Sequence, residues 1–164
     1  MSGANPGERE VTIRRATRAD IHAVMDCLTA AFAPYESRYT PGAFQDTVLS
    51  AESAERRLRE MTVIVAEDAS GVVGTIAAGA AGAGEGHLRG MAVLPHHQGR
   101  GIADRLLHAA EAELLRLGCA RVTLDTTKPL ERAIRFYERN GYRATGVVRD
   151  FFGMPLFEYA KELR

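Results

Sequence analysis

The sequence predicts an α/β protein, a single domain built on a mixed sheet with helices on both faces. Its 164 residues suit one domain with a proper core; residues 1–10 are polar and predict a disordered lead, which leaves residues 11–164 as the domain. Apolar residues alternate over short stretches, as in strands, and recur every three or four residues over longer ones, as in helices. The two patterns follow one another as β, α, α, β, β, β, α, β, α, β, β, which implies a mixed sheet covered on both sides.

The first third of the chain predicts one strand and two helices. Residues 11–15 alternate as in a strand, and Thr17 with Asp20 three positions later resembles a capping box at a helix start. Residues 33–60 mix aromatic, Pro, Gly and charged residues before a second helix pattern. The stripe of the first helix, which Pro34 ends, consists of Ile21, Val24, Met25, Leu28 and Phe32.

The middle of the chain predicts three strands. Residues 62–66 and 72–78 form a hairpin pattern around the turn at 68–71. Residues 77–86, AAGAAGAGEG, are of low complexity and predict a mobile connection into the central strand at 88–94.

The last third predicts a strand at 120–125, a helix, and two further strands at 142–148 and 156–160. Pro129 stands near the first position of the helix, and Asn140-Gly141 predicts its left-handed end. The apolar stripe of this helix is Leu130, Ala133, Ile134 and Tyr137.

The most informative stretch is the turn Gln98-Gly99-Arg100-Gly101, which leads into a long amphipathic helix that Gly118 stops. The first amides of a helix have no intrahelical acceptor, and the helix dipole adds partial positive charge, so anions bind there. Gly99 and Gly101 remove side chains that would keep a diphosphate away, and Arg100 supplies a positive charge. The turn therefore predicts a phosphate-bearing cofactor; the alternative is a glycine-rich turn without a ligand.

Two common phosphate motifs do not fit this turn. A P-loop needs Lys and then Ser or Thr after its last glycine, where this chain has Ile102 and Ala103. A dinucleotide fingerprint needs a third glycine where this chain has Asp104.

Two segments together carry a family resemblance. Residues 98–103, Q-x-x-G-x-A after the strand MAVLP, resemble the cofactor motif of the GCN5-related N-acetyltransferase (GNAT) superfamily, and residues 133–142, AIRFYERNGY, resemble its A-x-x-F-Y-x-x-x-G-F segment. With the flanking elements the resemblance covers nearly the whole chain. It implies a mainly antiparallel sheet of about seven strands and an N-acetyltransferase that moves an acetyl group from acetyl-CoA directly to a primary amine.

The resemblance also implies roles for individual residues. Tyr137 would give a proton to the departing thiolate, and His87 stands where many members carry a basic Glu; Glu67 and Glu85 are rival bases. The backbone of the central strand would polarise the thioester carbonyl. The cofactor-binding residues would be Met91, Ala92, Val93, Gln98, Gly99, Arg100, Gly101, Ile102, Ala103, Asp104, Thr126 and Tyr137.

One position departs from the family pattern, and the role of one segment has two interpretations. Leu130 stands where a cofactor-contacting Asn is common, and Thr126 or Thr127 would substitute for it. In the superfamily the segment between the first two strands walls the acceptor site, although aromatic residues there can equally well just cover the sheet. The candidates are Phe32, Tyr35, Arg38, Tyr39 and Phe44, with Phe151 from the C-terminal part.

The charge balance and the cysteine content limit which binding partners and cofactors we expect. Twenty-one basic residues balance 21 acidic ones, so total charge gives no reason to expect nucleic acid or an anionic membrane as a partner. Cys27 and Cys119 have no metal or redox spacing, so we expect neither a zinc site nor a disulfide. Without a long apolar run, we expect a cytoplasmic protein. We expect a small-molecule amine as the acceptor, with a protein amine as the alternative. A homodimer is an open possibility. The alternative function is a non-catalytic acyl-CoA sensor.

Overall fold

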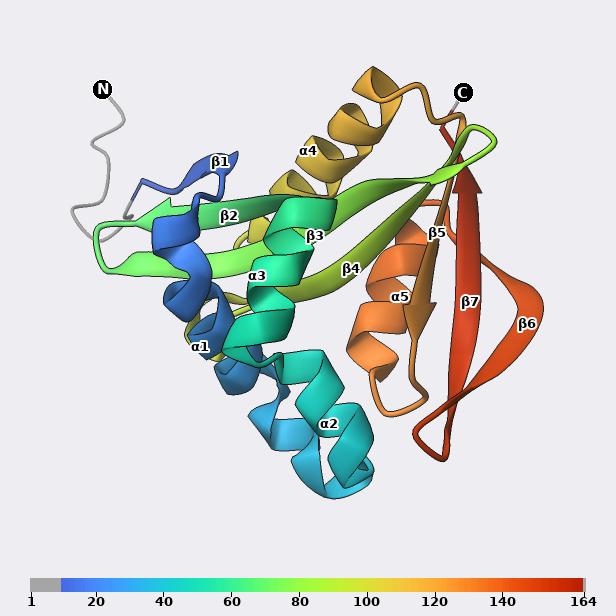
Figure 1. Cartoon of the computed structure of the whole chain (residues 1–164), viewed down its shortest axis with the longest axis horizontal. Coiled ribbons are helices and arrows are strands. Elements are labelled where there is room, and N and C mark those ends of the chain that lie inside the picture. Colours follow the sequence, from blue (N-terminus) through green and yellow to red (C-terminus); the bar gives the residue numbers. More distant parts are fainter. Residues whose placement is uncertain (1–9, 164) are drawn as a thin grey trace.

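In the computed structural model, which describes residues 10–163, one seven-stranded sheet has the order β1-β2-β3-β4-β5-β7-β6 (Figure 1). Neighbouring strands are antiparallel except β4 and β5, which run parallel, so the predicted mixed, mainly antiparallel sheet is confirmed. The strands are β1 (Thr12–Arg15), β2 (Thr62–Asp68), β3 (Gly71–Gly82), β4 (Glu85–Val93), β5 (Arg121–Thr126), β6 (Arg143–Phe151) and β7 (Met154–Glu162). The α-helices are α1 (Ile21–Phe32), α2 (Pro41–Val48), α3 (Ala51–Glu60), α4 (Ile102–Arg116) and α5 (Glu131–Arg139).

Helices cover both faces of the sheet because the side chains of its inner strands are apolar on both sides. In β2, Val63 and Val65 pack in one cluster with Leu28 of α1, whereas Ile64 and its neighbour Ala66 pack in a second cluster with α4. Figure 1 accordingly shows α1 and α3 in front of the sheet and α4 behind it.

The strands β4 and β5 pair only over their first halves. Pairing runs from Glu85 opposite Arg121 to Leu88 opposite Leu124, and then the strands separate (Figure 1). Thr75 and Ala77 of β3 are separated by one residue, but their partners in β4, Ala92 and Arg89, are separated by two residues. Strand β4 therefore contains a bulge at this point. Gly90 lies in the bulge with φ +61°, a left-handed conformation that glycine adopts without strain. The bulge bends β4 along β3 while β5 follows β7, and this opens the sheet.

The predicted mobile connection at 77–86 is wrong. Strand β3 continues to Gly82, and a two-residue turn at Ala83 and Gly84, both with positive φ, leads directly into β4. The small residues have a packing reason: a Cβ at Gly86 would lie 2.7 Å from Leu114 of α4. The stretch is rich in small residues because α4 packs closely against the strand at Gly86.

Residues 33–60 form two α-helices after a 3₁₀ segment (Ala33–Arg38), where the sequence predicts one. Thr40 caps α2 by accepting from the amide of Ala43 at 3.3 Å, and Ser50 caps α3. Leu49 lies between them with φ +68° and breaks the helical path. The predicted capping box before α1 is confirmed, since Thr17 N donates to Asp20 Oδ2 at 2.7 Å.

The C-terminal elements follow the prediction with shifted ends. Helix α5 begins at Glu131, so Pro129 lies in the preceding turn, and Gly141 ends the helix with φ +94° as predicted. Cys27 and Cys119 are free, buried thiols in the two separate core clusters. None of the helices within residues 10–163 is long and apolar enough to cross a bilayer. The predicted disordered lead falls almost entirely on residues 1–9, which lie outside the described residues.

Leu114 and Leu117 of the α4 region give a matched test of the core. Leu114 is 0% exposed between α4 and the sheet, whereas Leu117 is 42% exposed. We expect Leu114→Ala to lower the free energy of unfolding by about 2–5 kcal/mol, because it removes buried methyl groups and leaves a cavity. Leu117→Ala should change it by less than about 0.5 kcal/mol. Urea unfolding of both variants measures this; equal losses would mean that α4 does not pack as described.

Candidate active site

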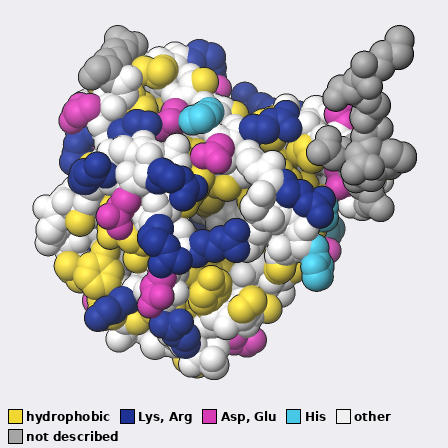
Figure 2. Space-filling view, turned by 180° about the vertical axis from the view of Figure 1, so that it is seen from behind, with side chains coloured by type: hydrophobic (Ala, Val, Ile, Leu, Met, Phe, Trp, Pro, Cys, Tyr) yellow, Lys and Arg dark blue, Asp and Glu magenta, His cyan; other side chains and the backbone are white. Residues whose placement is uncertain are grey.

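A cavity of about 700 Å³ opens where β4 and β5 separate. It is bordered by the ends of these strands, by the start of α4, by α5, and by α1, α2 and α3 from the other face of the sheet. Figure 2 shows a hollow on the α4 and α5 face with Lys and Arg side chains gathered around it. The predicted site residues that line the cavity are Phe32, Tyr35, Tyr39, His87, Met91, Ala92, Val93, Gln98, Gly99, Gly101, Ile102, Ala103, Asp104, Thr126, Tyr137 and Phe151.

The start of α4 presents free backbone amides to this cavity. The first bond of the helix runs from Arg105 N to Gly101 O at 3.2 Å, so the amides of residues 102–104 have no acceptor within the helix. Gly99 and Gly101 are both left-handed, with φ +79° and +78°, and no atom lies within 4 Å of a Cβ built at Gly101. Two such glycines before a helix form a concave row of N–H donors with open space in front of it, which suits an anion.

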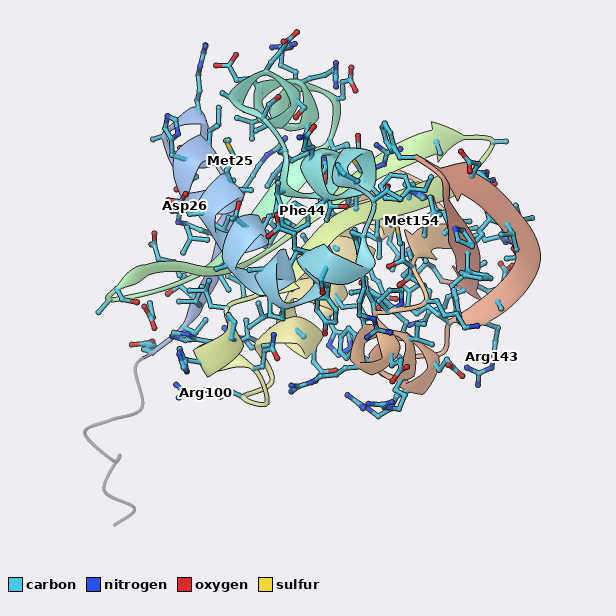
Figure 3. All side chains as sticks on the ribbon, turned by 90° about the horizontal axis from the view of Figure 1, so that it is seen from below. Met25, Asp26, Phe44, Arg100, Arg143 and Met154 are labelled. Carbon is cyan, nitrogen blue, oxygen red and sulfur yellow. The ribbon has the colours of Figure 1, made fainter. Side chains whose placement is uncertain are left out.

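A chain of hydrogen bonds holds this turn to its neighbours. Gln98 Nε2 donates to Val93 O at 3.1 Å, and Arg132 Nη1 of α5 donates to Gln98 Oε1 at 2.9 Å. Together with Arg135 and Arg139, Arg132 lines the cavity from α5. Arg100, the predicted source of positive charge, is exposed, does not line the cavity, and extends away from it (Figure 3). The basic side chains at this end of the cavity therefore come from α5.

His87 lies in the last paired stretch of β4, next to β5. Its Nδ1 is 2.7 Å from Thr123 Oγ1, and its Nε2 is 3.5 Å from Asp125 Oδ2. The Thr123 hydroxyl also donates to Gly86 O at 3.5 Å. Burial lowers the pKa of His87, while the Asp125 carboxylate opposes this shift. The ring is thus neutral at neutral pH and stands beside a carboxylate that would stabilise its protonated form.

Tyr137 lies on the opposite wall, on α5, and is 8% exposed. Its ring packs against Phe136 and, edge-on, against Tyr142, with centroids 5.4 and 5.8 Å away. Burial raises the pKa of the phenol, so the hydroxyl keeps its proton at neutral pH. Nearby, the buried Oγ1 of Thr126 has no hydrogen-bond partner among the described residues. A polar ligand in the cavity would satisfy it.

Aromatic residues close the end of the cavity opposite to α5. The hydroxyls of Tyr39 and Thr127 are 2.5 Å apart, which ties the segment after α1 to the end of β5. Phe32 contacts both Tyr35 and Tyr39, with ring centroids 6.4 and 6.3 Å apart. Phe44, labelled in Figure 3, and Arg38 do not line the cavity. Phe32, Tyr35 and Tyr39 therefore form one wall of the cavity, and Phe151 of β6 also lines it.

The two rival bases lie elsewhere. Glu67 pairs with Arg14 at 2.8 Å near the β1 edge of the sheet, and Glu85 pairs with Arg121 at the start of β4. Neither lines the cavity. Of the three candidates for a base, the cavity contains His87 only.

Sequence reasoning missed seven Asp and Arg residues of the cavity: Asp46, Arg57, Arg89, Asp125, Arg132, Arg135 and Arg139. Arg89 and Asp125 could have been found, because each lies close to a predicted site residue on its own strand. Asp46 and Arg57 carry no such signal, since they belong to helices whose positions on the sheet only the fold defines.

Comparison with known proteins agrees with this geometry. The acetyltransferase (GNAT) family model matches residues 22–142, and the chain therefore belongs to that family. An acetyltransferase of the GNAT family from Staphylococcus aureus Mu50 is 18% identical over 94% of this chain and 100% of its own, with a TM-score of 0.77. The PaiA N-acetyltransferase of Thermoplasma acidophilum, solved with coenzyme A, is 19% identical over 93% and 99% (TM-score 0.75). The yncA protein of Salmonella typhimurium, solved with acetyl-CoA, is 22% identical over 94% and 95% (TM-score 0.71).

The environment of His87 predicts its titration. The imidazole should titrate below its ordinary pKa of 6.5, and Asp125→Asn should lower this pKa further, because the carboxylate favours the protonated ring. Since the unfolded chain then takes up the proton first, His87 lowers the free energy of unfolding as pH falls below about 6.5. NMR titration of the ring protons, assigned with His87→Gln, measures the pKa. A value above 6.5, or an upward shift in Asp125→Asn, would contradict the described contacts.

Proposed function

We propose that this protein transfers an acetyl group from acetyl-CoA directly to a primary amine, with both substrates bound together. The observation that carries the proposal is the cavity itself. It brings the unpaired part of β4, the free amides of α4, a neutral histidine and a protonated tyrosine into one space. No cysteine or serine is among the described residues that line it, which favours direct attack by the amine over a covalent acyl-enzyme.

The residues present fit acetyl-CoA, which would supply an activated acetyl thioester. The amides after Gly101 and the guanidinium groups of Arg132 and Arg135 suit its phosphates. The edge of β4 from Arg89 to Val93 has no strand partner on the β5 side within the described residues, so its backbone groups can pair with an extended amide-bearing arm and polarise a carbonyl. The partnerless Thr126 hydroxyl offers a further contact.

His87 and Tyr137 would handle the protons. The imidazole of His87 accepts a proton from the amine, and Asp125 stabilises the resulting imidazolium. Tyr137 donates its phenolic proton to the thiolate that departs, since burial keeps this phenol protonated. The acid limb of the pH profile of kcat/KM should then follow the pKa found for His87. The assignment of residues 11–164 to one N-acetyltransferase domain and a cytoplasmic location stay predictions.

Thiol release from acetyl-CoA against a panel of amines tests the function. The panel contains amino acids, polyamines, aminoglycosides and a lysine peptide. Release above the hydrolysis rate, with a mass increase of one acetyl group on the amine, supports the proposal. Tight CoA binding without turnover of any amine would instead indicate the acyl-CoA sensor.

Gly101→Glu tests the phosphate site. The change puts a side chain and a negative charge in front of the free amides of α4, so CoA affinity should fall by roughly 100-fold or more. Gly118→Glu is a matched control at the other end of α4: its φ is +86° and no atom lies within 4 Å of its built Cβ. Isothermal calorimetry compares the two. Equal CoA affinities in folded variants would move the phosphate site elsewhere.

Tyr137→Phe tests the proton donor, because it removes only the hydroxyl and keeps the buried ring. We expect kcat to fall roughly 10- to 1000-fold with CoA affinity nearly unchanged. Steady-state kinetics with the best amine, together with CoA calorimetry, measures both. A kcat within about twofold of wild type would reject Tyr137 as the acid and leave the acetyltransferase proposal intact, since polarisation and approximation also accelerate the reaction.

A further inference from the structure

Two guanidinium groups face the acceptor side of the cavity: Arg57 on α3 and Arg89 on β4. The position of Arg57 is fixed by the bulge of β4. A Cβ built at Gly90 would lie only 2.7 Å from Arg57 Nη1 and 4.0 Å from Leu28 of α1. The guanidinium thus lies directly against the strand, within the segment from Arg89 to Val93 proposed to polarise the thioester, in space that any side chain at position 90 would fill.

Neither group has a carboxylate partner. Among residues 10–163, no Asp or Glu oxygen lies within 4.0 Å of Arg57 or Arg89. Burial lowers the pKa of Arg57 to about 10, and the neighbouring charge of Arg89 adds to this shift, so Arg57 still carries its charge at neutral pH. Arg57 is partly buried and Arg89 is exposed. A partly buried cation such as Arg57 is costly without a partner unless a ligand supplies the opposite charge. Within residues 10–163, the arginines that do pair with carboxylates are Arg14, Arg18, Arg116, Arg121 and Arg149.

The acids near Arg57 and Arg89 do not pair with them. Asp46 of α2 lines the cavity and its charge acts on Arg57, but it lies beyond ion-pair distance. Asp125, the other acid near His87, lies 3.5 Å from His87 and 3.4 Å from Arg149, so neither carboxylate pairs with Arg57 or Arg89. Arg89 also acts on the pKa of His87, which places this positive region within the span of a small molecule from the proposed base.

The phosphates of the cofactor are poor candidates for this region. Gly90 and Arg57 border Leu28, which belongs to the cluster on the α1 face of the sheet. The free amides of α4 and the arginines of α5 lie on the other face, where α4 packs and Figure 2 shows its basic side chains. The two positive regions are thus separated by the sheet, one for each substrate.

We propose that Arg57 and Arg89 bind a carboxylate of the acceptor, so that the acceptor is a small amino acid whose amine is presented to His87. This rests on the proposed function. The planar guanidinium groups match a carboxylate through paired N–H donors, and the aromatic wall with Tyr35 and Tyr39 takes the apolar part of the same molecule. A protein lysine offers no carboxylate beside its amine and would leave both cations unpaired.

Matched substrates test the proposal. Each amino acid of a panel, such as phenylalanine, is compared with its amide and with the amine that lacks the carboxylate, at equal concentrations of free amine. The wild type should favour the best amino acid over its matched amine by roughly 10- to 100-fold in kcat/KM, the range expected for a hydrogen-bonded charge. Preference for the neutral amine, for phosphoethanolamine or for a lysine peptide would overturn the carboxylate assignment.

Variants locate the effect. In Arg57→Gln and in Arg89→Gln, the preference for the acid over its matched amine should fall towards one. Arg56→Gln, an exposed neighbour on α3 outside the cavity, should keep the wild-type ratio. Because the two substitutions lie on different elements, Arg89→Gln still tests the proposal if Arg57→Gln does not fold. A wild-type ratio in both folded variants would overturn the proposal.

Binding without turnover separates this proposal from the proposed function. N-acetylphenylalanine and N-acetylphenethylamine, the products of the matched pair, are titrated into the protein with CoA present. Calorimetry should show tighter binding of the acid, lost in Arg57→Gln but kept in Arg56→Gln. This result would support the carboxylate site even if no amine is acetylated, whereas equal affinity of both products together with amine turnover would overturn the site and leave the acetyltransferase intact.

Discussion

The separation of β4 from β5 is the constraint on which the site depends. A parallel pair of strands would normally continue to the ends of both, and the backbone of β4 would then be fully engaged. The extra residue at Gly90 bends β4 towards β3, and β5 stays with β7, so the pairing stops at Leu88. The bulge thereby exposes a strand edge inside the molecule, where a ligand can reach it, instead of at the outer edge of the sheet.

The two faces of the sheet contribute different chemical groups to the cavity. The α4 and α5 face offers helix amides, arginines and Tyr137, whereas the α1 to α3 face offers aromatic rings, Arg57 and Arg89. His87 lies at the start of the opening, between the two. Its neutral state follows from burial, and its capacity to hold a proton follows from Asp125, so the same position supplies both properties that a base needs.

Features with local causes could be predicted from the sequence. The capping box at Thr17, the glycine turn before α4, the left-handed end of α5 and the hairpin of β2 and β3 depend on residues within a few positions of one another. The family resemblance also predicted much of the cavity: the residues it implied for cofactor, acceptor and catalysis line the same space, except Arg38, Phe44 and Arg100. The direction of these three side chains depends on the packing of their segments, which a short motif does not encode.

By itself, then, the sequence determined the order of the strands, the glycine turn before the long helix and the acetyltransferase family resemblance, because these rest on periodicity, glycine conformation and short motifs. Only the tertiary structure decided that Arg57, 33 positions before Gly90, lies against its backbone, that Asp125 stands beside His87, and that the alanine-glycine stretch is a tight hairpin. The physical reason is the same in each case: these arrangements follow from strand register and helix packing across the sheet, which no local pattern of residues encodes.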